Sequence, residues 1–197
     1  MSLFDHTRFH ILRHGQTAMN AAGLIGGSSD VPLSDLGQRQ ARFAAQAWQD
    51  LPIGRLITSP LLRARQTAEA VAALRPDLTL EDAPPLAERD WGLWEGQPRA
   101  MLVRDATPPG GEAPDAFRDR IRAGVMAIPA PGTAEAPPLI VAHSGTAREI
   151  FALLDLPFLR PQNGTLITLT RDVAGTWWAR PPRHAPETSP SNRKRIA

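Results

Sequence analysis

The chain has 197 residues, 42% of them hydrophobic, no cysteine, and a formal net charge of +2. This length and apolar content predict one domain with a buried core, and the missing cysteine excludes disulfides, thiolate metal ligands and cysteine nucleophiles. Residues 180–197 hold five Lys or Arg against one Glu, which leaves a slightly acidic body without the basic surface that nucleic-acid binding requires.

No apolar run of about 18 residues occurs, so we expect neither a membrane span nor a membrane partner. The first ten residues, MSLFDHTRFH, lack the basic and apolar regions of a secretory signal, and we expect a cytoplasmic protein. Residues 180–197 are basic and rich in proline, which predicts a flexible tail after a single domain of residues 1–179.

The first expected element is a strand at 8–13, RFHILR. A helix is expected at 34–50, with Ser34 as N-cap and with one face made largely of Leu36, Phe43, Ala44, Ala47 and Trp48. A short strand at 55–59 follows, and Pro60 is expected near the first turn of a second helix at 60–74.

Residues 81–111 are rich in proline and contain two tryptophans, which predicts a lid-like insertion over one edge of the fold. After it we expect a helix at 112–128, a loop at 128–138, a strand at 139–143, a helix at 145–156, and strands at 164–170 and 175–180. This alternation predicts an α/β fold, a three-layer α/β/α sandwich around a mostly parallel sheet.

Three of the expected strands end in chemically active residues. The first ends at Arg13 and His14, the second ends at Ser59 before a helix that carries Arg63, and a later one ends at His143. Ligands of open α/β sheets bind outside the carboxyl ends of the strands, so we expect these side chains to converge there.

Two chemistries fit two histidines at such a place. His14, His143 and Glu88 could hold iron or zinc, but the neighbouring arginines would oppose a cation. In covalent phosphoryl transfer, a neutral imidazole attacks phosphorus, arginines and a second histidine hold the phosphoryl oxygens, and a general acid protonates the leaving alkoxide. Nearby positive charge would keep the attacking imidazole neutral, and this chemistry requires neither a metal ion nor an organic cofactor.

Four segments, LRHGQTAMN, SPLLRARQTA, LAERDWGLWEG and VAHSGTAREI, resemble the signature blocks of the histidine phosphatase superfamily, in the branch that includes cofactor-dependent phosphoglycerate mutase. They occur in the family's order and cover residues 9–155. The segment GGSSDVPLSDLGQRQA also resembles the family's connection between its first strand and first helix. The resemblance implies a phosphoglycerate mutase-like fold.

The resemblance implies that His14 is the phosphorylated nucleophile and that Glu88 is the proton donor. Arg13, Arg63 and His143 would complete the catalytic set. The phosphate-binding residues would be Arg13, Thr17, Asn20, Arg63, His143 and Ser144. Glu95 is expected to anchor the insertion rather than to act as an acid.

Phosphoglycerate mutases resemble one another in a longer, basic insertion, whereas the stretch after WEG is short here and its basic residues are Arg99 and Arg104. We therefore expect a phosphatase that hydrolyses a phosphate monoester of a small metabolite. The alternatives are a 2,3-bisphosphoglycerate-dependent phosphoglycerate mutase and a non-catalytic module that binds a phosphorylated ligand.

Two groups in and near the insertion bear on the substrate. One group either lines an apolar pocket over the leaving group or packs the insertion onto the body: Trp91, Leu93, Trp94 and Met101. The other group either meets an anionic substrate or is solvated: Arg89, Arg99 and Arg104.

Overall fold

The computed structural model of the chain describes residues 5–129 and 136–180. Six strands form one sheet in the order β3–β2–β4–β1–β5–β6. The first four in this order run parallel, and β5 and β6 are antiparallel to their neighbours. The strands are β1 (Arg8–Arg13), β2 (Arg55–Thr58), β3 (Leu80–Asp82), β4 (Pro138–Ala142), β5 (Leu166–Arg171) and β6 (Trp177–Ala179). The expected mostly parallel α/β sheet is confirmed.

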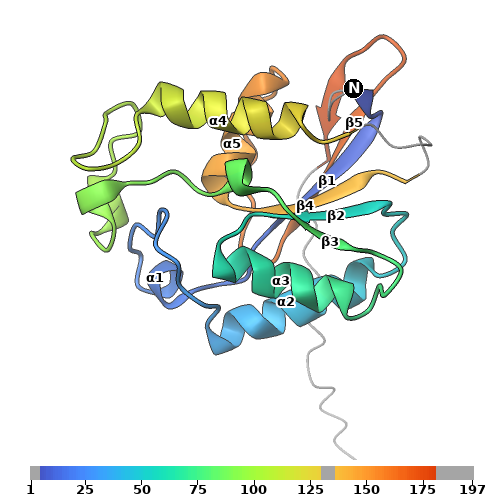
Figure 1. Cartoon of the computed structure of the whole chain (residues 1–197), viewed down its shortest axis with the longest axis horizontal. Helices are drawn as coiled ribbons and strands as arrows, with labels where there is room; N and C mark the ends of the chain where they lie inside the picture. Colours follow the sequence, from blue (N-terminus) through green and yellow to red (C-terminus); the bar gives the residue numbers. More distant parts are fainter. Residues whose placement is uncertain (1–4, 130–135, 181–197) are drawn as a thin grey trace, which may run out of the picture.

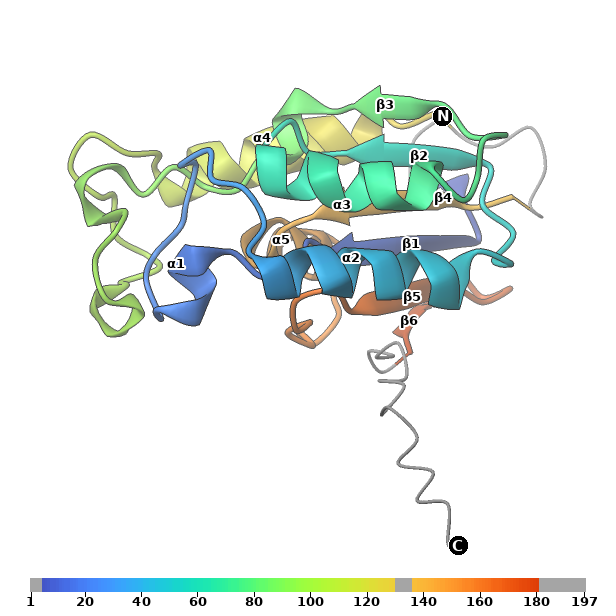
Figure 2. The same ribbon diagram turned by 90° about the horizontal axis from the view of Figure 1, so that it is seen from below.

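Helices cover both faces of this sheet, so the expected three-layer arrangement is also confirmed (Figures 1 and 2). The α-helices are α1 (Ala18–Ala21), α2 (Asp35–Trp48), α3 (Leu62–Ala72), α4 (Pro114–Met126) and α5 (Ser144–Leu153). Short 3-10 turns are η2 (Pro84–Leu86), η3 (Gly92–Trp94) and η4 (Arg99–Met101). Helices α2 and α3 lie on one face of the sheet, and α4 and α5 lie on the other.

The central strands supply apolar side chains to both faces, since successive strand residues point in opposite directions. Ile11 of β1 and Ile140 of β4 belong to the core under α4 and α5. Their neighbours Leu12 and Val141 belong to the core under α2 and α3. The sheet is therefore rigidly packed where β1 and β4 end.

Helix α2 is capped as expected, because the Ser34 side chain accepts a hydrogen bond from the Gly37 amide. The expected buried face was wrong in part: Leu36 is 41% exposed, Ala47 is exposed, and the buried residues are Gly37, Ala41, Ala44 and Ala45. A Cβ at Gly37 would lie 2.0 Å from the carbonyl oxygen of Gln16. Helix α2 thus packs directly on the backbone that follows β1, and only small residues allow this approach.

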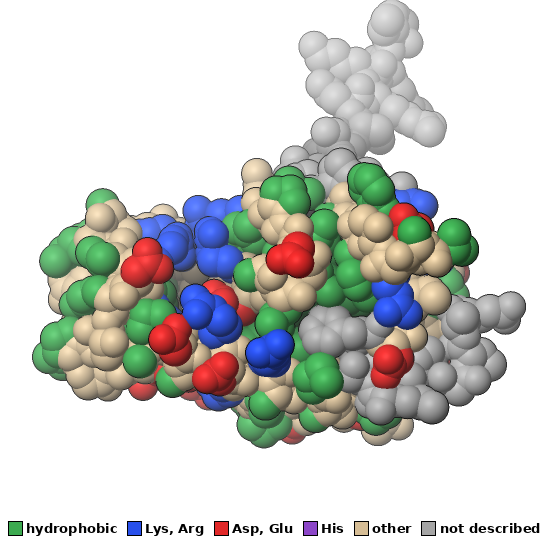
Figure 3. Space-filling view, turned by 90° about the horizontal axis from the view of Figure 1, so that it is seen from above, with side chains coloured by type: hydrophobic (Ala, Val, Ile, Leu, Met, Phe, Trp, Pro, Cys, Tyr) green, Lys and Arg blue, Asp and Glu red, His purple; other side chains and the backbone are tan. Residues whose placement is uncertain are grey.

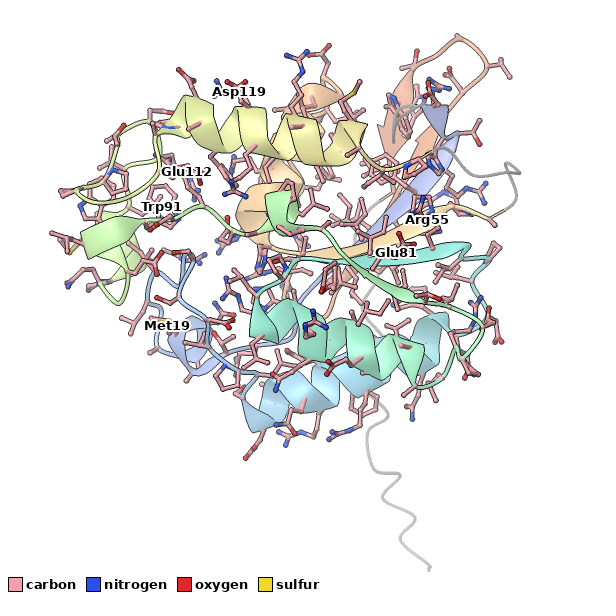
Figure 4. The ribbon with its side chains drawn as sticks, in the orientation of Figure 1. Met19, Arg55, Glu81, Trp91, Glu112 and Asp119 are labelled. Atoms are coloured by element: carbon pink, nitrogen blue, oxygen red, sulfur yellow. The ribbon has the colours of Figure 1, made fainter. Side chains whose placement is uncertain are left out.

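The start of the expected insertion proved to be a strand. Residues 80–82 form β3, which pairs with β2, and Arg55 of β2 is ion-paired with Glu81 of β3 (Figure 4). Helix α3 begins at Leu62 and its N-cap is Leu61, so Pro60 lies directly before the first turn, near it as expected. The expected hairpin at the end of the described chain is confirmed by the pairing of β5 with β6.

The rest of the insertion crosses to the end of the molecule at which the parallel strands point, where it lies beside α1 (Figure 2). There the Ile25 amide donates to the carbonyl of Gln97 at 2.9 Å, and the Arg99 amide donates to the carbonyl of Gly23 at 2.9 Å. The insertion is therefore hydrogen-bonded to the segment that follows β1. Its lid-like action stays a prediction, and the predicted tail lies outside the described residues from 181 onward.

Within the described ranges, no helix is long and apolar enough to cross a membrane.

Candidate active site

The two histidines follow neighbouring parallel strands that are in register. Arg13 of β1 pairs with Ala142 of β4, so His14 and His143 each come one residue after a matched pair. Their rings lie 5.1 Å apart between centroids, at an angle of 56°. Thr58 of β2 pairs with Val141, which places Ser59 at the same edge of the sheet.

A small cavity opens at this edge. Its lining includes most of the predicted site residues, namely Arg13, His14, Thr17, Asn20, Arg63, Glu88 and Ser144. Four further lining residues are Gly26, Gly27, Val31 and Arg99. His143 is fully buried next to His14. The structure therefore brings all the predicted residues to one place.

His14 has a defined tautomer when its ring is neutral. Its Nδ1 lies 2.7 Å from the carbonyl oxygen of Gly15, and a carbonyl only accepts, so Nδ1 carries the proton. Burial lowers the pKa of His14 well below its usual 6.5, and the positive charges of Arg63 and Arg13 lower it further. At neutral pH the ring is uncharged and Nε2 has a free lone pair.

His143 is held through Nε2, whereas His14 is held through Nδ1. Its partner is Ser59, which our sequence analysis placed at a strand end without giving it a role. His143 Nε2 lies 2.7 Å from Ser59 Oγ, and this oxygen also accepts a hydrogen bond from the Leu61 amide at 3.3 Å. When the Ser59 hydroxyl donates to Nε2, the proton of the neutral ring is on Nδ1. Among the described residues this buried Nδ1 has no hydrogen-bond partner, which leaves it a donor for a ligand.

Burial also lowers the pKa of His143 well below 6.5, and the positive charges of Arg63, Arg13 and Arg120 act in the same direction. The ring is therefore neutral at pH 7, and which of its nitrogens carries the single proton depends on Ser59.

Arg13 and Arg63 are cationic at neutral pH, and only some of their N–H donors form hydrogen bonds within the protein. Burial lowers the pKa of Arg13 to about 10, and its Nη1 donates to the carbonyl of Pro161 at 2.9 Å. The terminal nitrogens of Arg63 donate to the carbonyls of Ser29 at 2.8 Å and Gly27 at 2.7 Å. Each terminal nitrogen of a guanidinium carries two protons, so both arginines retain donors for an anion.

Thr17 and Asn20 cap the short helix α1 by exchanging side-chain and backbone hydrogen bonds. Sequence analysis missed Asn163, whose amide donates to the carbonyl of His14 at 3.0 Å and to Oδ1 of Asn20 at 3.0 Å. Asn163 thus ties the turn after β1 to α1. No motif marks it, because it is about 150 residues away in the chain.

Glu88 reaches the cavity from the insertion and accepts hydrogen bonds from the amides of Gly145 at 2.9 Å and Arg89 at 3.0 Å. A Cβ at Gly145 would lie 2.0 Å from Oε1 of Glu88. The glycine after Ser144 therefore makes room for this carboxyl group at the start of α5.

Glu95 anchors the insertion, as expected. It accepts hydrogen bonds from the backbone amides of Ser28, Ser29 and Trp91 and from both serine hydroxyls. Burial raises the pKa of Glu95, but these hydrogen bonds outweigh burial and hold it below its usual value. The same loop offers Arg63 its two carbonyl acceptors, so this anchor also supports the cavity wall.

Of the two alternatives that we considered for Arg89, solvation is wrong, and contact with an anionic substrate stays a prediction, since Arg89 lines the cavity beside Glu88. Its side chain is 3% exposed, donates to the carbonyls of Arg104, Ala106 and Glu112, and stacks 4.2 Å from the Trp91 ring centroid. It is a structural residue that folds the insertion, because its donors are directed at backbone acceptors.

The four apolar residues considered from the sequence, Trp91, Leu93, Trp94 and Met101, differ in their surroundings. Trp91 is buried and stacks on Trp94 at 6.0 Å between centroids, and it lines a second cavity beside Glu88. Leu93 and Met101 are 75% and 58% exposed and belong neither to the core clusters nor to the two cavities at this edge. Leu93 and Met101 therefore neither line an apolar pocket over the leaving group nor pack the insertion onto the body, and both alternatives were wrong.

The metal site considered from the sequence is not formed. Over residues 5–129 and 136–180, no group of three His, Cys, Asp or Glu side chains is placed to hold a metal ion.

Comparison with known families gives a match over most of the chain. The profile of the Histidine phosphatase superfamily (branch 1) matches residues 9–176. The agropine synthesis reductase of Rhizobium rhizogenes is 31% identical over 175 residues, 83% of this chain and 39% of that protein. Fructose-2,6-bisphosphatase TIGAR B of Danio rerio is 36% identical over 128 residues, 57% of this chain and 49% of that protein. The chain thus spans less than half the length of these two relatives.

A solved structure with a similar fold is the mycobacterial glucosyl-3-phosphoglycerate phosphatase in complex with VO3. It has a TM-score of 0.73 and 26% sequence identity, covering 88% of this chain and 97% of that one.

Proposed function

Because the chain belongs to branch 1 of the histidine phosphatase superfamily, we propose that it hydrolyses small phosphate monoesters through a phosphohistidine on His14, without a metal ion. The observation that carries this proposal is the hydrogen bond from His14 Nδ1 to the Gly15 carbonyl. It leaves Nε2 of a neutral, buried imidazole as the nucleophile, beside a cavity lined by arginines.

The phosphoryl group occupies the small cavity. Arg13 and Arg63 offer charged donors, and His143 offers its unpartnered Nδ1–H. Further donors come from the side chain of Asn20 and from the Ser144 amide in the first turn of α5. These donors are in place before the substrate binds, so they stabilise the charge that develops on the phosphoryl oxygens.

Glu88 is the proton donor of the first step. Nε2 of His14 forms a bond to phosphorus, the bond from phosphorus to the ester oxygen breaks, and Glu88 gives its proton to that oxygen. In the second step Glu88 takes a proton from water, the water oxygen bonds to phosphorus, and the bond to Nε2 breaks. Phosphate leaves, and the histidine returns to its starting state.

The first test compares hydrolysis of p-nitrophenyl phosphate in EDTA by the wild type and by His14→Ala. We expect turnover in the wild type only, together with an acid-labile phosphoryl label on the wild-type chain. Equal turnover in His14→Ala would refute the mechanism. Loss of activity in EDTA would indicate a metal hydrolase, and phosphate binding without turnover would indicate a binding module.

A second test separates the role of Glu88 from general damage. Nitrophenolate leaves without protonation, whereas an alkoxide does not, so Glu88→Gln should lower kcat/KM far more for n-butyl phosphate than for p-nitrophenyl phosphate. General acid catalysis is typically worth about 100-fold or more. Equal losses for both substrates would reject Glu88 as the acid.

A mutase would instead transfer the phosphoryl group between phosphoglycerates in the presence of 2,3-bisphosphoglycerate. Phosphate release from the wild type at a rate unaffected by added 3-phosphoglycerate would favour the phosphatase.

A further inference from the structure

Resting on the proposed phosphatase activity, we propose that the alcohol part of the substrate carries a second anionic group, a carboxylate or a phosphate. Arg104 of the insertion and Arg148 of α5 would bind it in the cavity beside Glu88.

This second cavity has a volume of about 410 Å³, which is in the range of small-molecule sites. Glu88 lines both this cavity and the small phosphate cavity, and the adjacent residues Ser144 and Gly145 line one cavity each. A proton donor must touch the leaving oxygen. The leaving group therefore extends from Glu88 into this larger space.

Four residues of the cavity lining are apolar. Trp91 comes from the insertion, Pro114 and Phe117 come from α4, and Ala152 comes from α5. Figure 4 shows Trp91 and Glu112 on the insertion side, near the N-terminal end of α4. These side chains suit the carbon skeleton of a small metabolite.

The lining also contains four arginines, of which two are committed to contacts within the protein. Arg89 donates to three backbone carbonyls, and Arg118 contacts both Asp115 at 2.8 Å and Glu149 at 3.5 Å. For Arg104 and Arg148, no side-chain hydrogen bond or ion pair to another described residue is present. Arg148 lies over the ring of Phe158, 4.1 Å from its centroid.

The two uncommitted arginines line the same cavity. Burial lowers the pKa of Arg148, and the positive charge of Arg104 lowers it further, while Glu149 and Glu88 act in the opposite direction. In the space-filling view, basic and acidic side chains lie together around a hollow between the insertion and the rest of the molecule (Figure 3). Two guanidinium groups that repel each other are both stabilised when an anion binds between them.

Glu149 and Glu88 favour the charge of Arg148, but over the described residues no acidic residue of the lining forms an ion pair with Arg104 or Arg148. Glu149 is partly buried, its pKa is raised by that burial, and it contacts Arg118. Glu88 accepts two backbone hydrogen bonds and lies at the junction with the phosphate cavity, and Asp105 is exposed. Arg104 is exposed as well, so both it and Arg148 have donors free for an anionic group of the substrate.

The test uses three phosphate monoesters with the same four-carbon chain: n-butyl phosphate, 4-phosphooxybutanoate and butane-1,4-diol bisphosphate. We expect kcat/KM, per phosphate group, to be at least tenfold higher for one of the anionic esters than for n-butyl phosphate. The preferred ester identifies the second group as carboxylate or phosphate. Arg104→Gln and Arg148→Gln should each lower this ratio severalfold.

Arg122→Gln is the matched control, because it removes one exposed arginine of α4 that does not line the cavity. It should leave the ratio at the wild-type value. A wild-type ratio near one, or a ratio that Arg104→Gln and Arg148→Gln do not change, would overturn the inference while leaving the phosphatase intact. Absence of turnover for all three esters and for p-nitrophenyl phosphate would overturn the proposed function itself.

Discussion

His10 should make the fold sensitive to acid, and this effect has to be known before any pH profile of activity is interpreted. The side chain is 2% exposed in the central strand β1, and its Nδ1 lies 2.9 Å from Oγ1 of Thr168 on β5. Its Nε2 is buried and has no partner among the described residues. Burial and the charge of Arg8 lower the pKa of His10 from 6.5 to about 4.

Whether acid stabilises or destabilises the fold depends on which state of the chain, folded or unfolded, binds the proton on His10 more tightly. Below pH 6.5 the unfolded chain takes up a proton at His10 that the folded chain binds only near pH 4, so acid favours unfolding. One pKa unit corresponds to about 1.4 kcal/mol, which gives a total loss of about 3 kcal/mol once the pH is below 4. About 2 kcal/mol of it is lost between pH 7 and pH 5.

The assay is urea unfolding of the wild type and His10→Asn at pH 7 and pH 5. Asparagine places a polar atom near the position of Nδ1, so it can keep the contact with Thr168 while it has no proton to gain. We expect the wild type to lose about 2 kcal/mol more than the variant between the two pH values. Equal losses would show that His10 titrates normally and would refute the reasoning. At pH 7 both proteins should have the same kcat/KM, since His10 does not line the phosphate cavity.

Two further predictions concern the site. In the His10→Asn background, kcat/KM for p-nitrophenyl phosphate, whose leaving group needs no proton from Glu88, should fall less than twofold from pH 7.5 to 5.5 after correction for ionisation of the substrate, because the pKa of His14 lies well below 6.5. A histidine with the ordinary pKa would give about a tenfold fall, and that result would contradict a neutral buried His14. Ser59→Ala should lower kcat/KM about tenfold, and its ¹⁵N NMR spectrum should show a mixture of the two tautomers of His143. Ser59→Thr keeps the hydroxyl and should preserve both the wild-type kcat/KM and the single tautomer. Identical kinetics for the two variants would show that the Ser59 hydroxyl does not direct the proton of His143.

Most of the fold could be predicted because its central strands are short apolar runs between turn residues, and its helices have clear periodicity. The error in α2 has a local cause. Leu36 was assigned to the buried face on hydrophobicity, but the helix approaches Gln16 so closely that Gly37 has to face the body. Strand β3 was missed because it has three residues, too few to show a period.

The residues that we propose to bind the phosphoryl group could be found from the sequence because each lies in a recognisable motif, and Arg13, His14 and His143 lie where strands end. The groups that orient these residues could not be found from the sequence. Ser59 is 84 residues from His143, and Asn163 is 149 residues from His14, so only the fold brings them together. Ser59 and Asn163 carry no charge that a motif would select, yet Ser59 decides which nitrogen of the neutral His143 ring carries its proton. Substitution at Ser59 therefore tests the mechanism more sharply than removal of His143. It changes which nitrogen of His143 carries the proton, while every group that we propose to contact the phosphate stays in place.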